Sequence, residues 1–281
     1  MKQIISNAIL ILVLARASWA QGPTQFHPGF NLFSKQQDVQ LGQENAAQVR
    51  AHMKVIRNPV LNDYVNKVGR RLVAAREAQE SGFPFTSEVV ADPTINAFAL
   101  PGGPMFINTG LLRAVDNEAQ LAGVIGHEMS HVILRHGTNQ ASKSKLVELP
   151  AVLGSQVAGG SLVGQLTKLG IGLGANSVLL KFSRSAESQA DLMGSHLMAE
   201  SGYNPMEMAR FFEKLNQQGG RRTIQFLSDH PSPENREKAI EEEVHRLPDQ
   251  QYTYQTGDFQ RMKALIAHVR EPKPPAPAKA Q

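Results

Sequence analysis

Apolar side chains recur every three or four residues between positions 59 and 77, at Leu61, Tyr64, Val65, Val68 and Leu72. This spacing predicts an amphipathic helix with one buried face. A second helical pattern runs from Lys35 toward Asn58-Pro59, where the proline is suited to open the next helix. Gly82 and Pro84 then end the helical region.

Three short runs of apolar and β-branched residues follow, at 85–90, 96–100 and 105–108. Turn residues separate them, first Asp92-Pro93 and then Pro-Gly-Gly-Pro at 101–104, so we expect a small β-sheet. These runs lie directly before the next helical pattern. The sheet is therefore expected beside that helix.

The helical period returns after the predicted sheet. Asp116 is suited to cap a helix that continues to about His136, where Gly137 is suited to stop it. Further helices are expected at 185–200, at 205–218 and after Ser232-Pro233. The whole pattern predicts an α+β fold that is mainly helical, with the small sheet next to the helix that starts near Asp116.

The composition limits the chemistry that this fold can carry. The 281 residues include no cysteine, which excludes disulfides, thiolate metal ligands, a catalytic thiol and a lipidated N-terminal cysteine. The formal charge is +4 and the basic residues are scattered along the chain, so we expect no nucleic-acid partner. Any metal site must use His, Asp or Glu.

The two ends of the chain predict segments outside a catalytic domain. Residues 1–20 are typical of a cleaved signal peptide, with Lys2, an apolar run and small residues before Gln21. Cleavage after Ala20 is expected, with Ala17 as the alternative, and so is a periplasmic or otherwise extracytoplasmic location. We interpret 21–34 as an N-terminal extension, 35–246 as the catalytic domain, and 247–281 as a C-terminal extension with a disordered proline-rich tail.

The segment 149–180 is unusual because it carries one charged residue, Lys168, among many glycines. One interpretation is a loosely packed helical hairpin or a lid over the cleft. The other is a peripheral membrane contact, although Ser, Gln, Asn and Thr make the segment less hydrophobic than a normal spanning helix.

Residues 127–131, His-Glu-Met-Ser-His, form an H-E-x-x-H motif inside a predicted helix, which is the context that gives this motif its meaning. A spacing of four places His127 and His131 on one side of the helix, where both can bind one zinc ion. Glu128 falls in the apolar stripe of the same helix, where a carboxylate without a partner is costly. We interpret Glu128 as the general base that takes a proton from a zinc-bound water, with a surface carboxylate as the alternative.

A catalytic zinc usually has three protein ligands. Glu187 and Asp191 are four residues apart on a later predicted helix, so they share one face. We assign Glu187 to the metal and Asp191 to a hydrogen bond that orients a ligand imidazole. From these residues alone, two solvated carboxylates on a helix surface are the alternative.

Several stretches of the sequence resemble the M48 metallopeptidases, which include membrane-embedded enzymes and soluble periplasmic relatives. They are 96–103, 109–112, 118–132, 183–191, and His230-Pro231 with Arg236. Together they are spread over nearly all of residues 35–246. The resemblance implies a zincin-like metallopeptidase domain with one zinc ion per chain, and it implies that Glu187 is the third ligand and Asp191 its support.

The resemblance also implies further roles. The stretch Asn96, Ala97, Phe98 and Ala99 resembles the substrate-binding edge of these enzymes, where a peptide adds as an extra strand. His230 is implied to lie near the active site, either as an oxyanion stabiliser or as an occupant of the open zinc position in a latent state. Arg236 is implied to be an ion-pair or orienting residue. We interpret Arg135 and His136 as structural residues at a helix end.

These observations predict a zinc metalloendopeptidase that cleaves unfolded or misfolded proteins of the cell envelope. One alternative is a latent or inactive chaperone-like module that keeps the metal, and His230 makes it credible. A second is a non-enzymatic metal-binding envelope protein, against which Glu128 argues.

Overall fold

The structure of the chain, a computed structural model, describes residues 22–143, 181–218, 225–233, 235–255 and 257–271. The predicted signal peptide, the segment 149–180 and the tail 272–281 lie outside these residues, and those interpretations stay predictions. Within the described part, no helix is both long enough and apolar enough to cross a membrane.

The first helices follow the predicted break at proline. Helix α1 spans Lys35–His52 and begins with a reciprocal capping box between Ser34 and Gln37. Helix α2 spans Pro59–Val73, with Pro59 at its first position, and α3 spans Arg76–Ser81. The buried face of α2 is the one that the apolar spacing predicts.

A three-stranded sheet follows these helices, in the order β1-β3-β2. Strands β1 (Thr86–Val90) and β3 (Pro104–Asn108) are parallel, whereas β2 (Ala97–Ala99) is antiparallel to β3 and forms one edge. Helix α4 (Thr109–Ala114), which the pattern did not predict, follows β3 directly.

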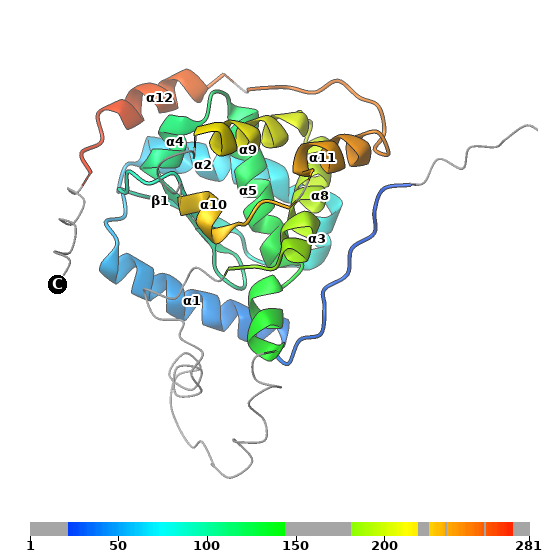
Figure 1. The fold of residues 1–281 in the computed structure, drawn as a ribbon. Helices are drawn as coiled ribbons and strands as arrows, with labels where there is room; N and C mark the ends of the chain where they lie inside the picture. Colours follow the sequence, from blue (N-terminus) through cyan, green and yellow to red (C-terminus); the bar gives the residue numbers. More distant parts are fainter. Residues whose placement is uncertain (1–21, 144–180, 219–224, 234, 256, 272–281) are drawn as a thin grey trace, which may run out of the picture.

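Helix α5 (Glu118–Ile133) runs through the centre of the domain (Figure 1). Helices α2, α8 (Arg184–Glu200) and α9 (Met206–Gln218) pack around it, and β2 lies beside it. Every residue of α5 is buried. Its N-cap is Asn117 and not the predicted Asp116, because the Asn117 side chain accepts the hydrogen bond from the Gln120 amide. The helix stops at Ile133, before the predicted His136, and a further helix covers 136–143, so the predicted stop at Gly137 is wrong.

The remaining helices cover one side of α5 and the end of the sheet. They are α8 (Arg184–Glu200), α9 (Met206–Gln218), α10 (Gln225–Asp229), α11 (Arg236–Val244) and α12 (Phe259–Ala267). The prediction that Ser232-Pro233 opens the next helix is wrong. Helix α11 begins only at Arg236, because Asn235 before it adopts a left-handed backbone with φ 56°. The predicted fold class is confirmed: α+β, mainly helical, with a small sheet next to the H-E-x-x-H helix.

Candidate metal centre

Two buried helices bring the predicted metal ligands together. His127 and His131 lie on α5, and Glu187 lies in the first turn of α8. The helices cross closely at Gly126 and Gly194, since a Cβ built on Gly194 would lie 3.2 Å from the backbone nitrogen of His127. The close crossing lets a short carboxylate side chain on α8 reach imidazoles on α5.

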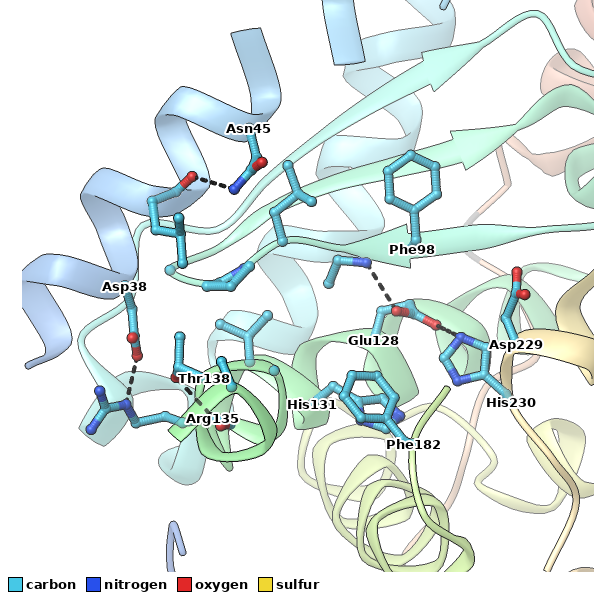
Figure 2. A pocket seen from close by; sticks show the side chains of 18 residues that line it. Asp38, Asn45, Phe98, Glu128, His131, Arg135, Thr138, Phe182, Asp229 and His230 are labelled. Atoms are coloured by element: carbon cyan, nitrogen blue, oxygen red, sulfur yellow. Dashed lines mark hydrogen bonds and ion pairs between the residues drawn. The ribbon is translucent and has the colours of Figure 1, made fainter. Parts of the chain in front are cut away.

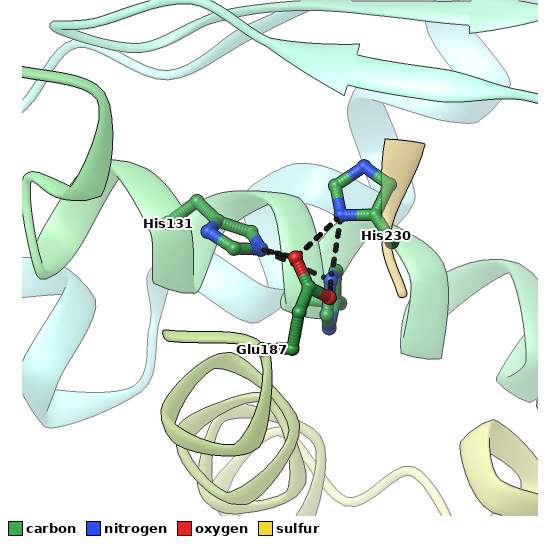
Figure 3. A group of neighbouring side chains, drawn as sticks. His131, Glu187 and His230 are labelled. Atoms are coloured by element: carbon green, nitrogen blue, oxygen red, sulfur yellow. Dashed lines mark hydrogen bonds and ion pairs between the residues drawn. The ribbon is translucent and has the colours of Figure 1, made fainter. Parts of the chain in front are cut away.

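Three imidazole nitrogens and the Glu187 carboxylate converge on one point (Figure 3). His127 Nε2 lies 3.1 Å from His131 Nε2, 3.3 Å from Glu187 Oε2 and 3.3 Å from His230 Nδ1. Glu187 Oε1 lies 3.5 Å from His131 Nε2 and 3.2 Å from His230 Nδ1. Ligands at about 2.0–2.1 Å around a tetrahedral zinc lie about 3.3 Å apart, so the spacing fits such an ion.

The electrostatics of this group favour a positive charge at its centre. Burial alone would lower the pKa of His127, but hydrogen bonds to Asp191 and Glu187 outweigh it and raise that pKa to about 9. Burial, helped by the charge of His127, lowers the pKa of His131 well below its usual range. Burial would raise the pKa of Glu187, but hydrogen bonds from His127 and His230 hold it far below normal. An ionised carboxylate beside a neutral imidazole is the donor set that a divalent cation requires.

A second layer of side chains orients these donors. Asp191 Oδ1 lies 2.9 Å from His127 Nδ1 and would accept a hydrogen bond from its ring proton, so that Nε2 would be the atom that binds a metal. Arg236 donates from Nε to Asp191 Oδ2 at 2.6 Å, and its Nη2 lies 3.4 Å from Glu187 Oε2. Its guanidinium also lies over the Phe212 ring, at 4.2 Å from the centroid. The structure thus places Asp191 and Arg236 where the predicted supporting residues belong.

Glu128 is buried on α5 next to the edge strand β2. Its Oε2 accepts a hydrogen bond from the Ala99 amide at 3.0 Å, and its Oε1 lies 3.3 Å from His230 Nε2 (Figure 2). Burial raises the pKa of Glu128 above its usual value, although the facing His230 and His127 oppose that rise. The carboxylate is therefore held by the backbone of β2 and aimed at the space beside the donor cluster.

His230 follows α10 and lies between Glu128 and the metal ligands. Its Nδ1 faces Glu187 while its Nε2 faces Glu128, so one ring contacts both groups. The ring stacks on Phe226, with centroids 4.7 Å apart. In this arrangement His230 Nδ1 occupies the fourth corner of the donor cluster.

The sequence profile of Peptidase family M48 matches residues 59–244. The chain belongs to peptidase family M48. This match confirms the resemblance seen in the motifs, and the metal dependence of M48 enzymes agrees with the buried group of three histidines and Glu187.

Relatives with assigned names agree with the M48 assignment. The chain is 32% identical to the beta-barrel assembly-enhancing protease of Escherichia coli (strain K12) over 207 residues, 71% of this chain and 42% of that protein. It is 33% identical to the mitochondrial metalloendopeptidase OMA1 of Schizosaccharomyces pombe over 197 residues, 69% of this chain and 56% of that one. The chain thus spans about half the length of these relatives. Membership of this peptidase family and the names of both relatives agree with the predicted enzyme class, a metalloendopeptidase.

The edge strand of this M48 domain has two different sides. Asn96 and Leu100 form backbone hydrogen bonds with β3, through Asn96 O and Leu100 N. Alternate residues of an antiparallel strand point their backbone groups the other way, so Ala97 and Ala99 carry the outward groups. The Asn96 side chain donates to Asp229 Oδ2 at 3.1 Å, and Phe98 is buried against Phe106. Peptide binding along this edge stays a prediction, since Ala97 is 1% exposed and the Ala99 N–H already donates to Glu128 Oε2.

Sequence reasoning missed the residues that support His131. His136 Nδ1 lies 2.9 Å from His131 Nδ1, and His136 Nε2 lies 3.1 Å from Gln189 Oε1 on α8. Phe182 stacks on the His131 ring at 4.1 Å. His136 can reach His131 because Arg135 adopts a left-handed backbone, with φ 56°, after α5 has ended. We had interpreted His136 as a helix-end cation, whereas burial lowers its pKa to about 4.

Proposed function

We propose that the protein is a zinc-dependent endopeptidase that hydrolyses peptide bonds of unfolded or misfolded envelope proteins. The observation that carries this proposal is the position of Glu128, which joins the donor cluster to the edge strand through its bond with the Ala99 amide. A peptide added to that edge would pass directly over both groups. The site therefore combines a place for the substrate backbone with a place for a Lewis acid.

His127, His131 and Glu187 would hold the zinc ion. Zinc in such a site lowers the pKa of a bound water to about 7 and polarises a carbonyl group. Glu128 is the base that accepts the proton of the attacking water, because its carboxylate faces the same space from a fixed position. Asp191 and Arg236 keep the His127 ring and the Glu187 carboxylate in place during this transfer.

The outward backbone groups of β2 support an unfolded polypeptide as the substrate. Strand addition uses main-chain hydrogen bonds, which exist in every peptide and need an extended segment without its own secondary structure. Ala97 and Ala99 have small side chains and turn their backbone groups away from β3, and a bound peptide would replace the hydrogen bond between the Ala99 amide and Glu128. A protease that binds in this way selects unfolded segments more than particular sequences.

A latent state is the second candidate, and the position of His230 favours it. His230 Nδ1 is 3.3 Å from His127 Nε2 and 3.2 Å from Glu187 Oε1, where a fourth ligand would lie. In this arrangement the enzyme would keep its metal but leave no position for a substrate carbonyl. Cleavage would then require that His230 move away, after which its ring could stabilise the oxyanion.

The decisive experiment compares purified wild-type protein with Glu128→Gln and His230→Ala. Elemental analysis should give one zinc per chain in all three proteins, because neither substitution removes His127, His131 or Glu187. Casein cleavage should fall at least about a hundredfold in Glu128→Gln, as expected for loss of a general base. Equal rates in wild type and Glu128→Gln would rule out the endopeptidase mechanism. A rate that rises in His230→Ala indicates the latent state, and one that falls indicates the oxyanion role.

We further propose that the chain works outside the cytoplasm. The residues Lys2 to Ala20 support this location, since a basic start, an apolar run and small residues are typical of export signals. N-terminal sequencing of protein recovered from the periplasmic fraction should begin at Gln21. An intact Met1 in that protein would contradict cleavage.

A further inference from the structure

A cavity opens beside Glu128 and His131 and extends toward α1 (Figure 2). Its empty volume is about 780 Å³, which includes the open mouth. The cavity is continuous with the space in front of the general base, so a group inside it would belong to a peptide bound at the active site.

Most of the wall is apolar. The side chains that provide it come from α1, β2 and its following turn, α5, and the segment after α5; they are Leu41, Phe98, Leu100, Pro101, Val132 and Ala141. An apolar lining of this kind favours a large hydrophobic side chain, since its burial removes apolar surface from water.

Two buried hydrogen-bond acceptors interrupt this wall, and both belong to α1. Asp38 Oδ1 and Asn45 Oδ1 have no hydrogen-bond partner among the described residues, although both side chains are 1% exposed. The other polar atom of each is engaged: Asp38 Oδ2 accepts from Arg135 Nε at 2.6 Å, and Asn45 Nδ2 donates to the Leu41 carbonyl at 2.8 Å. A buried acceptor without a donor is costly, and a donor on a ligand would satisfy it once a small side-chain shift opens the acceptor to the cavity.

The charges around the cavity indicate a neutral donor. The Asp38 carboxylate is already paired with the Arg135 guanidinium, and both line the cavity. A lysine or arginine side chain would lie close to this guanidinium, whereas a hydroxyl or an indole N–H carries no charge. Tyrosine and tryptophan combine a large apolar ring with one neutral donor at the edge.

We propose that this cavity is a specificity pocket that binds a tyrosine or tryptophan side chain of the substrate, with its donor directed to Asn45 Oδ1 or Asp38 Oδ1. The proposal rests on the endopeptidase function proposed above. The cavity lies along Phe98–Gly102, the C-terminal end of β2 and its turn. A peptide that runs antiparallel to β2 places residues on the N-terminal side of the scissile bond at this end.

Two glycines keep α1 close enough to supply these acceptors. A Cβ built on Gly42 of α1 would lie 1.8 Å from the Pro101 carbonyl oxygen, and one on Gly102 would lie 2.4 Å from Val39 Cα. Gly102 also has a φ of 78°, which favours glycine. The contact between α1 and the turn after β2 therefore leaves no space for side chains, and Asp38 and Asn45 reach the cavity for this reason.

The test uses a peptide library that varies one position at a time on the N-terminal side of the cut, with cleavage rates measured by mass spectrometry. At one fixed position, wild type should cleave tyrosine or tryptophan peptides about tenfold faster than the matched phenylalanine peptide, because phenylalanine leaves the acceptor unpaired. Asn45→Leu should reduce this ratio to about one while phenylalanine peptides are still cleaved. Gln43→Leu, an exposed change on the same helix, should keep the wild-type ratio.

Binding separates this proposal from the endopeptidase function. Fluorescence anisotropy with Glu128→Gln protein measures the affinity of uncleaved tyrosine and phenylalanine peptides, and the same preference is expected there. Absence of cleavage with a tyrosine preference in binding would overturn the endopeptidase and keep the pocket. A tyrosine-to-phenylalanine ratio near one in the wild type, or a ratio unchanged by Asn45→Leu, would overturn the pocket.

Discussion

The two sides of the donor cluster are built differently. His127, His131 and Glu187 belong to long buried helices that cross at paired glycines, and each has a supporting partner of its own. His230 follows the five-residue helix α10, which is joined to the start of β2 by one backbone bond, from Phe226 N to Ile95 O, and by side-chain bonds. Short elements with few contacts open locally at a lower free-energy cost than packed helices. We therefore expect His230 to leave the cluster more easily than the other three donors.

The largest effect is expected from removing a fixed donor. Glu187→Gln should lower zinc affinity by more than about a hundredfold, beyond the usual loss for a supporting residue, and should abolish cleavage. His230→Ala should keep the metal. Zinc competition with a colorimetric chelator measures both. Equal losses in the two variants would show that the sides of the cluster do not differ.

A smaller effect is expected at the supporting carboxylate. Asp191→Asn keeps the shape of the side chain but weakens the hydrogen bond to His127 and the pair with Arg236. Zinc affinity should fall about tenfold to a hundredfold. The exposed substitution Glu213→Gln, on α9, is the matched control and should leave the affinity unchanged.

Substitutions at Asp229, the residue before His230, should change the rate of casein cleavage by a few-fold. Asp229 accepts hydrogen bonds from Asn96 Nδ2 at 3.1 Å and from Gln225 Nε2 at 2.8 Å. Asp229→Ala removes both, so His230 should leave the cluster more often and casein cleavage should rise about threefold to tenfold at unchanged zinc content. Gln225→Ala removes one bond and should give a smaller rise. A fall in cleavage in both variants would contradict the latent state.

The smallest effect, a change in stability with pH, is expected at His196 on α8. Its Nε2 lies 2.6 Å from Glu243 Oε1 and its Nδ1 lies 3.7 Å from Glu77 Oε1. Burial lowers the pKa of His196, but hydrogen bonds to Glu77 and Glu243 raise it overall. The pKa of Glu243 is lowered because bonds from Thr24 and His196 outweigh its burial, and a bond from His196 lowers the pKa of Glu77.

The pH dependence of the folding stability follows from the raised pKa of His196 and the lowered pKa values of Glu243 and Glu77. The raised histidine stabilises the fold fully below pH 6.5 and less as pH rises through its folded pKa; the lowered carboxylates stabilise it above pH 4.5 and less as pH falls. His196→Gln should therefore cost roughly 1–2 kcal/mol between these values and less on either side. Urea unfolding at saturating zinc measures the difference between the two proteins, and a difference that is constant with pH would contradict it.

The sequence predicted what depends on local spacing. The four-residue intervals of His127–His131 and Glu187–Asp191 place each pair on one helix face, and the structure brings the two faces together. It did not predict His136 as a partner of His131, because a left-handed residue at Arg135 turns the chain between them.

Long-range packing decides the remaining differences. The acceptors of the specificity pocket lie some ninety residues before the motif that they face, and nothing near Asp38 in the sequence indicates a cavity. Helix α11 starts at Arg236, after the left-handed residue Asn235, whereas the local signal at Ser232-Pro233 favoured an earlier start. Helix α12 packs on α4 and α2 although it lies in the segment that we interpreted as an extension.

Arg236 is both the first residue of α11 and the cation that holds Asp191 and Glu187. Anchoring of α11 and assembly of the metal site are therefore a single cooperative event, since neither carboxylate is fully neutralised until this helix has docked. A chain that emerges from synthesis in order completes its hydrolytic centre only after residue 236 has been made. We therefore expect the metal site to assemble only when nearly the whole domain is folded.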